Sequence, residues 1–271
     1  MTQPSLARIG LSLATAIGAA WLTAAPMRAQ FERTISTTYD GWSQFPDGSY
    51  DLVFGYMNRN SSEVEVPLGA ANVVEPAPAD QGQPVNFLPG RQRDAFRVHV
   101  PKDFKGKFVW TLTYAGTTQT AIASLDQNYS LDVGDPEPPS IQSGGDRTIR
   151  LSETLSLAPV VKAPPPPPPT PENANIVTRA SRGARINVWW SKYRGPGAVI
   201  FGAGDTAAAS EGGPTGREFP MGAFRVPCPV PLTSACGATT AKFSAPGVYW
   251  LRVVAAERSA SNAMVKVTVN P

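Results

Sequence analysis

The stretch RINVWWSKYRGPGAVIF, residues 185–201, decides the fold of the second half of the chain. Gly195, Pro196 and Gly197 are typical of a turn, and the β-branched and aromatic residues on both sides favour strands. The stretch therefore predicts a β-hairpin with Trp189 and Trp190 at its centre. Because neighbouring side chains of a strand point to opposite faces, one indole can pack in the core while the other meets a neighbouring domain, a loop or a partner.

Two segments upstream of this stretch also alternate between apolar and polar residues. They read RTIRL at 147–151 and ETLSL at 153–157. An isolated pair of strands is marginal in water, so we expect these strands to join the tryptophan strand and a C-terminal hairpin. One sandwich then spans residues 135–271, and the proline-rich stretch 159–175 is a loop inside it. The alternative is a linker at the proline run, because polyproline forms stiff spacers.

The region before this sandwich, residues 30–134, also predicts short strands. We expect them at 49–56, 63–66, 96–100, 108–114, 117–124 and 129–133, with a proline-punctuated connection over 72–93. Short strands at this spacing without a convincing helix indicate an antiparallel sandwich. The predicted fold class is therefore all-β, with two antiparallel β-sandwich domains.

Several segments carry a resemblance to a known family. The second half, with PPSI at 138–141, residues 152–158, WSKYRGPG at 190–197 and FSAPGVYWLRV at 243–253, resembles bacterial PKD-type or immunoglobulin-like domains. The first half, with DGSYDLVFGYMNRN, FLPGRQR and VPKDF, is similar to the N-terminal region of exported bacterial proteins that carry such a domain. The resemblance implies an immunoglobulin or PKD-like second domain and no particular activity. Some of these domains place an acidic cluster after the second strand, but here prolines stand there, so the resemblance does not extend to a calcium site.

The N-terminus has the features of a secretory signal. Arg8 precedes an apolar run at 9–25, and the small residue Ala29 ends the segment. This order predicts a signal peptide over residues 1–29 with cleavage after Ala29. The rival interpretation is an uncleaved anchor, but the run of 17 residues is shorter than the roughly 20 that cross a bilayer. We therefore expect a periplasmic or extracellular protein without a membrane span after cleavage.

The two cysteines, Cys228 and Cys236, agree with export. In an oxidising compartment we expect them to form a local disulfide. A metal pair is the alternative, but it needs further ligands, and His99, the only histidine, lies far away in the sequence.

The charge of the chain is close to balanced. Cleavage after Ala29 lowers the net charge from +3 to +1, because it removes two arginines and no carboxylate. A nearly neutral chain gives no indication of a nucleic acid or an anionic membrane surface as partner.

Residues typical of catalysis are sparse. His99 lies on the polar face of its expected strand, where a solvent-facing role is more common than catalysis. Residues 199–207 mimic a strand with a dinucleotide fingerprint, but Gly212, Gly213 and Pro214 break the helix that the fingerprint needs. We therefore expect no enzyme activity and no cofactor.

Exposed aromatic residues and polar loops remain as candidates for partner or ligand contact. Aromatic rings on a surface can stack on sugars, although Trp and Tyr are more often buried. Arginine and amide side chains on loops can bind anions or peptides. The candidates are Trp42, Asn58, Arg59, Asn60, Arg91, Arg93 and Trp189.

These features together predict a non-catalytic exported module that binds a protein partner. The fold part of this prediction is an analogy, since one fold serves many functions. A carbohydrate-binding module with exposed aromatics is the first alternative, and a hydrolase with an unconventional site is the second.

Overall fold

The computed structural model describes residues 34–131, 138–163, 186–202, 223–228, 233, 236–257 and 259–271. The stretch from Arg33 to Pro271 forms one compact unit. The predicted signal peptide, the proline run and the glycine-rich stretch after residue 202 lie outside the described residues. No helix in the described part is long and apolar enough to cross a membrane.

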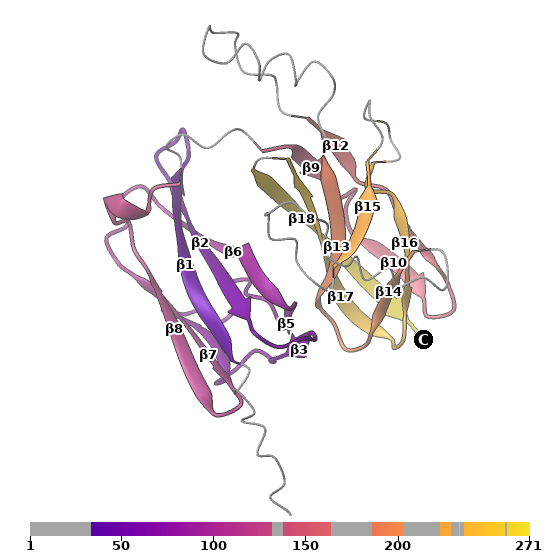
Figure 1. The fold of residues 1–271 in the computed structure, drawn as a ribbon, viewed down its shortest axis with the longest axis horizontal. Coiled ribbons are helices and arrows are strands. Elements are labelled where there is room, and N and C mark those ends of the chain that lie inside the picture. The colour runs from indigo at the N-terminus through magenta and orange to yellow at the C-terminus, as the bar shows by residue number, and fades with distance from the viewer. Residues whose placement is uncertain are drawn as a thin grey trace, which may run out of the picture. The chain divides into compact units, whose positions relative to one another are not determined.

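Eight strands and one 3₁₀ turn make up the first half of the unit (Figure 1). They form the antiparallel sheets β1–β2–β6, β4–β7–β8 and β3–β5. Their bounds are β1 (Ile35–Gln44), β2 (Tyr50–Asn58), β3 (Val64–Glu65), β4 (Asn72–Glu75), β5 (Asn86–Phe87), β6 (Gly90–Val100), β7 (Phe108–Tyr114), β8 (Thr117–Ala123) and η1 (Gln127–Tyr129).

An aromatic cluster fills the first core. Leu52, Phe54 and Tyr56 of β2 recur with period two and are buried, as the alternation predicts. Phe54 stacks on Phe96 with ring centroids 4.8 Å apart, and Trp110 meets the Phe96 ring edge-on at 4.9 Å. Offset and edge-to-face contacts of this kind are the arrangements that aromatic rings prefer.

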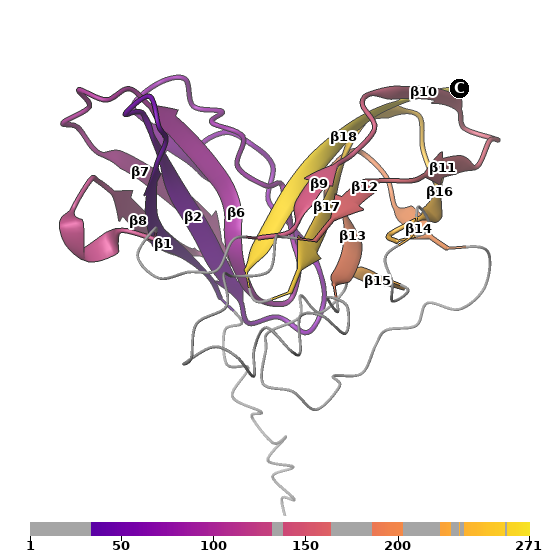
Figure 2. The same cartoon turned by 90° about the horizontal axis from the view of Figure 1, so that it is seen from above.

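The described residues of the second half, from 138 onward, include ten strands (Figure 2). They form the five-stranded sheet β10–β18–β17–β13–β15, the three-stranded sheet β11–β16–β14 and the pair β12–β9. The pairing of β10 with β18 is parallel, and the other described pairings are antiparallel. The bounds are β9 (Ser140–Gln142), β10 (Arg147–Arg150), β11 (Leu155–Leu157), β12 (Val160–Lys162), β13 (Asn187–Arg194), β14 (Val199–Phe201), β15 (Phe224–Pro227), β16 (Thr239–Phe243), β17 (Gly247–Ala256) and β18 (Ala260–Asn270).

The second core is separate from the first and lies between its two main sheets. Trp190 and Tyr249 are fully buried in it. The indole N–H of Trp190 donates to the carbonyl of Gly237 at 2.8 Å, so the polar end of this large side chain has a partner. The expected all-β fold of two antiparallel sandwiches is thus confirmed.

The predicted hairpin over 185–201 is wrong, although both of its strands exist. β13 belongs to the five-stranded sheet and β14 pairs with β16 in the opposite sheet. The chain changes sheets at Gly195, whose φ is +145°. A Cβ at this position would lie 2.2 Å from the Tyr249 ring. Only a glycine therefore fits where the chain passes close to this ring on its way from the sheet of β13 to the sheet of β14.

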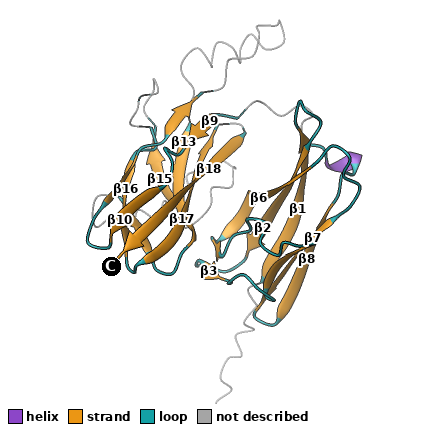
Figure 3. Cartoon of the chain, turned by 180° about the vertical axis from the view of Figure 1, so that it is seen from behind, coloured by secondary structure: helices purple, strands orange, loops and turns teal. Residues whose placement is uncertain are grey.

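Three other expectations about the first half need correction. The connection expected over 72–93 contains β4, β5 and the start of β6, and β1 was not predicted. The strand expected at 129–133 is replaced over its described part by the 3₁₀ turn η1, the helical element in Figure 3, and an isolated bridge at Ser130. Tertiary pairing overrides weak local preference in each of these places.

Strands upstream of the proline run pair with strands downstream of it. β10 lies beside β18, and β11 lies beside β16. Leu155 and Leu157 of β11 are buried in the second core. The placement of the domain boundary at residues 134–139 nevertheless stays a prediction, because residues 132–137 are outside the described part.

We predict that cutting the proline-rich loop leaves the second half intact. A specific protease site inserted between Pro169 and Thr170 should yield two fragments that co-elute in gel filtration and separate only on denaturation. The reason is that β10 and β11 stay paired with β18 and β16. A folded fragment beginning near Asn173 that elutes alone would show that the boundary lies at the prolines.

We also predict that Asn72 is essential for the first core. Its amide nitrogen donates to the carbonyls of Val66 and Pro84, and its side-chain oxygen accepts from the indole N–H of Trp110 at 3.0 Å. Asn72→Ala leaves these buried groups without partners, and each costs about 1–3 kcal/mol. Urea denaturation should show a loss of about 3 kcal/mol or more. The control Thr120→Ala, on the exposed side of β8, should change stability by less than about 0.5 kcal/mol.

Candidate functional site

The outer face of β13 and β17 is buried, although it points away from the second core. Val188 and Trp190 of β13 face that core, so Trp189, Ser191 and Tyr193 point to the other side. On the neighbouring strand β17, Arg252 pairs with Ser191 and Val254 pairs with Trp189. These side chains meet residues 80–95 of the first half, and we call this contact the junction.

Tyr193 is held at the junction by backbone carbonyls of the first half. Its hydroxyl lies 2.5 Å from the carbonyl oxygen of Gly82 and 3.2 Å from that of Ala95, so it donates to these acceptors. Burial raises the pKa of Tyr193 well above its ordinary value, because the interior disfavours the phenolate. The hydroxyl therefore remains a hydrogen-bond donor across the physiological pH range.

Arg194 makes the most specific ion pair of the junction. Its Nη1 and Nη2 atoms donate to the Asp80 carboxylate at 3.0 and 2.8 Å, and its Nε donates to the carbonyl of Gln83 at 3.0 Å. These hydrogen bonds from Arg194 hold the pKa of Asp80 below its ordinary value. A two-pronged arginine contact fixes orientation as well as distance.

Lys192 and Asn262 add two further links. The Lys192 ammonium lies 3.6 Å from the Glu63 carboxylate. Burial raises the pKa of Glu63, and the lysine partly opposes this effect. The Asn262 amide donates to the Asp94 carboxylate at 3.1 Å. The junction is therefore polar, with most of its contacts made by residues 192–194 and 80–95.

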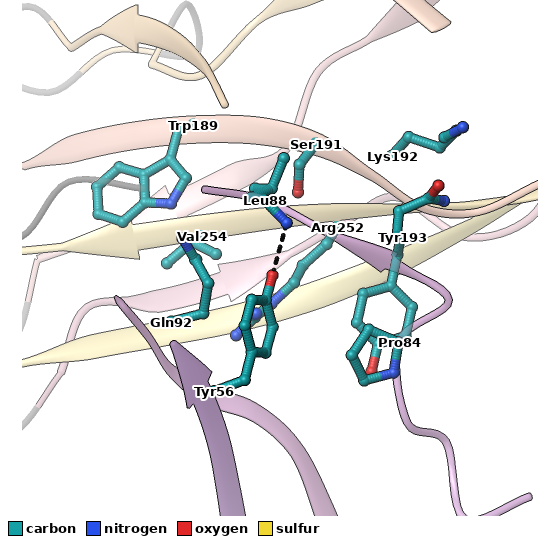
Figure 4. Close-up of a pocket in the computed structure, with 11 residues that line it drawn as sticks. Tyr56, Pro84, Leu88, Gln92, Trp189, Ser191, Lys192, Tyr193, Arg252 and Val254 are labelled. Atoms are coloured by element: carbon teal, nitrogen blue, oxygen red, sulfur yellow. Dashed lines mark hydrogen bonds between the residues drawn. The ribbon is translucent and has the colours of Figure 1, made fainter. Parts of the chain in front are cut away.

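A small cavity lies inside the junction (Figure 4). Figure 4 shows Tyr56 and Gln92 of the first half opposite Trp189 and Arg252 of the second. The Tyr56 hydroxyl accepts a hydrogen bond from the backbone N–H of Leu88 at 2.9 Å. About 10 Å³ of the cavity is open to the centre of a water molecule. This volume holds about one water, so the cavity is far smaller than a site for a sugar or a peptide.

Trp189 is the one predicted contact residue that lines the cavity, where it is half-buried. This placement confirms that the two neighbouring tryptophans face different environments. Trp42 is also half-buried, but it lies elsewhere, with its indole N–H donating to the carbonyl of Asp126 at 2.6 Å and its ring edge-on against Tyr50.

The predicted polar candidates lie at one end of the antiparallel pairing between β2 and β6, where the end of β2 meets the start of β6. Asn58 is buried and donates to the carbonyl of Phe87 at 2.8 Å, while its side-chain oxygen accepts from the backbone N–H of Asn60 at 2.9 Å. Arg59 is exposed in the turn that follows. Asn58 and Asn60 thus shape this turn, in addition to any role in binding.

Arg91 and Arg93 differ from each other in their surroundings. Arg91 is largely shielded and pairs with the Asp40 carboxylate at 2.5 Å, whereas Arg93 is exposed. The structure does not bring these arginines into the cavity with Trp189.

His99 lies on the exposed side of β6. Its Nδ1 atom is 3.0 Å from the Asp51 carboxylate, and its ring lies edge-on against Phe45. Arg97 also contacts Asp51, at 3.5 Å. This cluster lies outside the junction cavity.

The two cysteines form the expected disulfide, Cys228–Cys236. Among the described residues, no group of three or more His, Cys, Asp or Glu side chains is placed to hold a metal ion.

The junction residues Asn86, Tyr193, Arg194 and Arg252 were not singled out from the sequence. Tyr193 and Arg194 stand directly before the turn residue Gly195, and their alternation marks them only as strand residues. Their partners are backbone carbonyls and an aspartate more than a hundred positions away, which no local pattern shows.

Comparisons with known proteins find only distant structural similarity. No protein-family model matches the chain, and no curated protein matches its sequence. Among solved structures, the tandem Ig repeats of Dlar match at 13% identity and a TM-score of 0.32, over 88% of this chain and 97% of that one. The D0–D1 domain of intimin matches at 11% identity and a TM-score of 0.26, over 87% of this chain and 98% of that one. Superpositions with such low TM-scores carry no argument about function.

We predict that Tyr193→Phe weakens the junction. The substitution removes the donor to the buried carbonyls of Gly82 and Ala95 and should cost about 1–3 kcal/mol in urea denaturation. Tyr129→Phe, at an exposed ring, should cost less than about 0.5 kcal/mol.

The same variant should change the response to alkali. Because the folded state holds the Tyr193 proton more tightly, the unfolded state loses it first, near its ordinary pKa of 10.0. The difference in pKa between the folded and unfolded states therefore stabilises the folded state fully below pH 10. Above pH 10 the free energy of unfolding falls by about 1.4 kcal/mol per pH unit for this one group. Tyr193→Phe should remove this part of the slope, and an unchanged slope would contradict the assignment.

Proposed function

We propose that the protein is an exported, non-catalytic module that binds a protein partner through one uncharged sheet face. The face belongs to β7 and β8 in the first half. Its members are three cross-strand pairs, and we call it the β7–β8 face: Val109 and Ile122, Thr111 and Thr120, and Thr113 and Thr118.

This face points away from the core and is open to solvent. The residues between its members, Trp110, Leu112 and Ala121, are buried, so the members point outward. Ile122 is 56% exposed, and Thr118 and Thr120 are also exposed. An exposed strand with an apolar side chain and no charge is the feature that carries the proposal.

The outer face of the opposite sheet has the reverse character. There Asp51 contacts both Arg97 and His99, and Arg91 pairs with Asp40. Burying such a face against a partner would remove ionised groups from water at a cost of several kcal/mol. The six members of the β7–β8 face carry no ionised group, and Glu75 of β4, which pairs with Val109, lies at its border, so desolvation of the members costs far less while Glu75 stays in solvent.

The centres of interfaces between proteins share this lack of charge. Charged residues are depleted there, and a flat face of β-branched residues packs closely against another sheet or an extended segment. The threonine hydroxyls can also donate and accept hydrogen bonds at the rim. Among the described edge strands, β6 and β10 carry exposed arginines, and β11 and β14 are only three residues long, whereas the seven residues of β8 include none of the charges and prolines that commonly protect an edge.

Export and the bacterial PKD-like assignment belong to this proposal. The leader pattern of residues 1–29 and the local disulfide support export, because disulfides persist in oxidising compartments.

The test is capture of a partner by matched variants. The substitution Ile122→Lys introduces a charge on the proposed interface. The purified variant should bind an envelope protein captured by the wild type with an affinity at least about tenfold lower. Ile200→Lys, at a residue 63% exposed on β14, is the control and should bind like wild type.

Both substitutions are at exposed positions, so a urea titration should show each variant folded. A partner that both variants retain equally would refute the assignment of this face. Binding to a glycan array by the wild type, with no protein retained, would instead favour the carbohydrate-binding alternative.

A further inference from the structure

Arg252 is a buried cation with incomplete pairing. It is 8% exposed and lies on β17 opposite Ser191. Its Nη2 atom donates to the backbone carbonyl of Asp94, and its buried Nε atom has no hydrogen-bond partner. An uncompensated charge in a protein interior costs several kcal/mol, so a buried arginine normally has an anionic partner.

The other cations near the junction show the normal arrangement. Arg194 pairs with Asp80, and Lys192 pairs with Glu63. Among the described carboxylates, none lies within 4.0 Å of Arg252. The side chain of Asp94 is engaged by Arg97 and Asn262 instead.

The cavity beside Arg252 contains a second group without a partner. Asn86 is 2% exposed, and neither its amide nitrogen nor its side-chain oxygen makes a hydrogen bond. Asn86 lines the cavity together with Arg252, Tyr56, Gln92 and Ser191. Figure 4 labels the last four of these. Buried polar groups in native proteins have partners with few exceptions, so two unpartnered donors at one cavity, the Arg252 Nε and the Asn86 amide nitrogen, indicate a binding site for a hydrogen-bond acceptor.

The size of the cavity restricts that occupant. With about 10 Å³ open to the centre of a water molecule, there is room for one water or one ion of similar size. A side chain inserted by a partner protein would not fit without moving the junction apart.

We propose that the junction cavity binds a compact inorganic anion of about the size of chloride. The guanidinium of Arg252 supplies the charge, and the amide N–H of Asn86 is the neutral donor. The anion neutralises the only junction cation that lacks a carboxylate among the described residues, and so stabilises the contact between the two halves. This site is independent of the β7–β8 face and of any protein partner.

The test is thermal unfolding of the full protein in chloride and in gluconate at the same ionic strength. Gluconate is too large for the cavity. Chloride well above its Kd should raise Tm by about 2–4 °C in a saturable manner, because it binds only the folded state. Equal Tm values in both salts would overturn the proposal.

Three variants separate the site from general salt effects. Arg252→Gln should lose the chloride-dependent increase in Tm, whereas Arg97→Gln, a partly exposed arginine with carboxylate partners, should keep it. Asn86→Asp supplies a carboxylate inside the cavity, so it should remove the chloride dependence and remain folded.

If Arg252→Gln does not fold, Asn86→Asp decides the question. A chloride-dependent increase that persists in Asn86→Asp would refute the site, and its loss in a folded variant would support it.

Discussion

The double burial of β13 is the constraint on which the arrangement of the described unit depends. Trp190 faces the second core, while Ser191 and Tyr193 on the opposite side are also buried. A sheet with one solvent-facing side needs only alternating polar residues there, but a sheet buried on both sides must satisfy every polar group it carries. The hydroxyl of Tyr193 and the guanidinium of Arg194 do this by bonding to the first half. Arg252 and Asn86 are exceptions at the junction, because the Nε of Arg252 and both polar side-chain atoms of Asn86 make no hydrogen bond with the described residues.

The polar junction and the uncharged β7–β8 face are two surfaces with different chemistry and different proposed roles. The junction uses ion pairs and backbone acceptors, which are directional and fix one relative register of the contacting strands. The β7–β8 face offers area without charge, which suits association with a partner because little must be desolvated. The charged outer face of β2 and β6, with Asp51, Arg97 and His99, suits solvent.

Individual residues show where prediction from sequence works. The period of two over Leu52, Phe54 and Tyr56 correctly indicates side chains that are buried in the first core, but it does not show that Val53, on the other side of β2, is buried as well. The presence of two cysteines, Cys228 and Cys236, behind a predicted signal peptide correctly predicts their disulfide. The hairpin at Gly195 was predicted from an equally strong turn signal and is wrong, because a turn motif does not say whether the next strand joins the same sheet. Asn58 and Arg91 were chosen as polar surface residues, but both are largely shielded from solvent and hydrogen-bonded within the fold.

The sequence by itself determined the all-β class, the strand positions with strong alternation and the disulfide, since each follows from interactions between residues near in the chain. Only the tertiary structure decided which strands share a sheet, that β13 is buried on both faces, and that Asn86 and Arg252 meet at one cavity. These features depend on contacts between residues far apart in the chain, such as Asn86 and Arg252, which are 166 positions apart, and no local pattern encodes which distant groups will face each other.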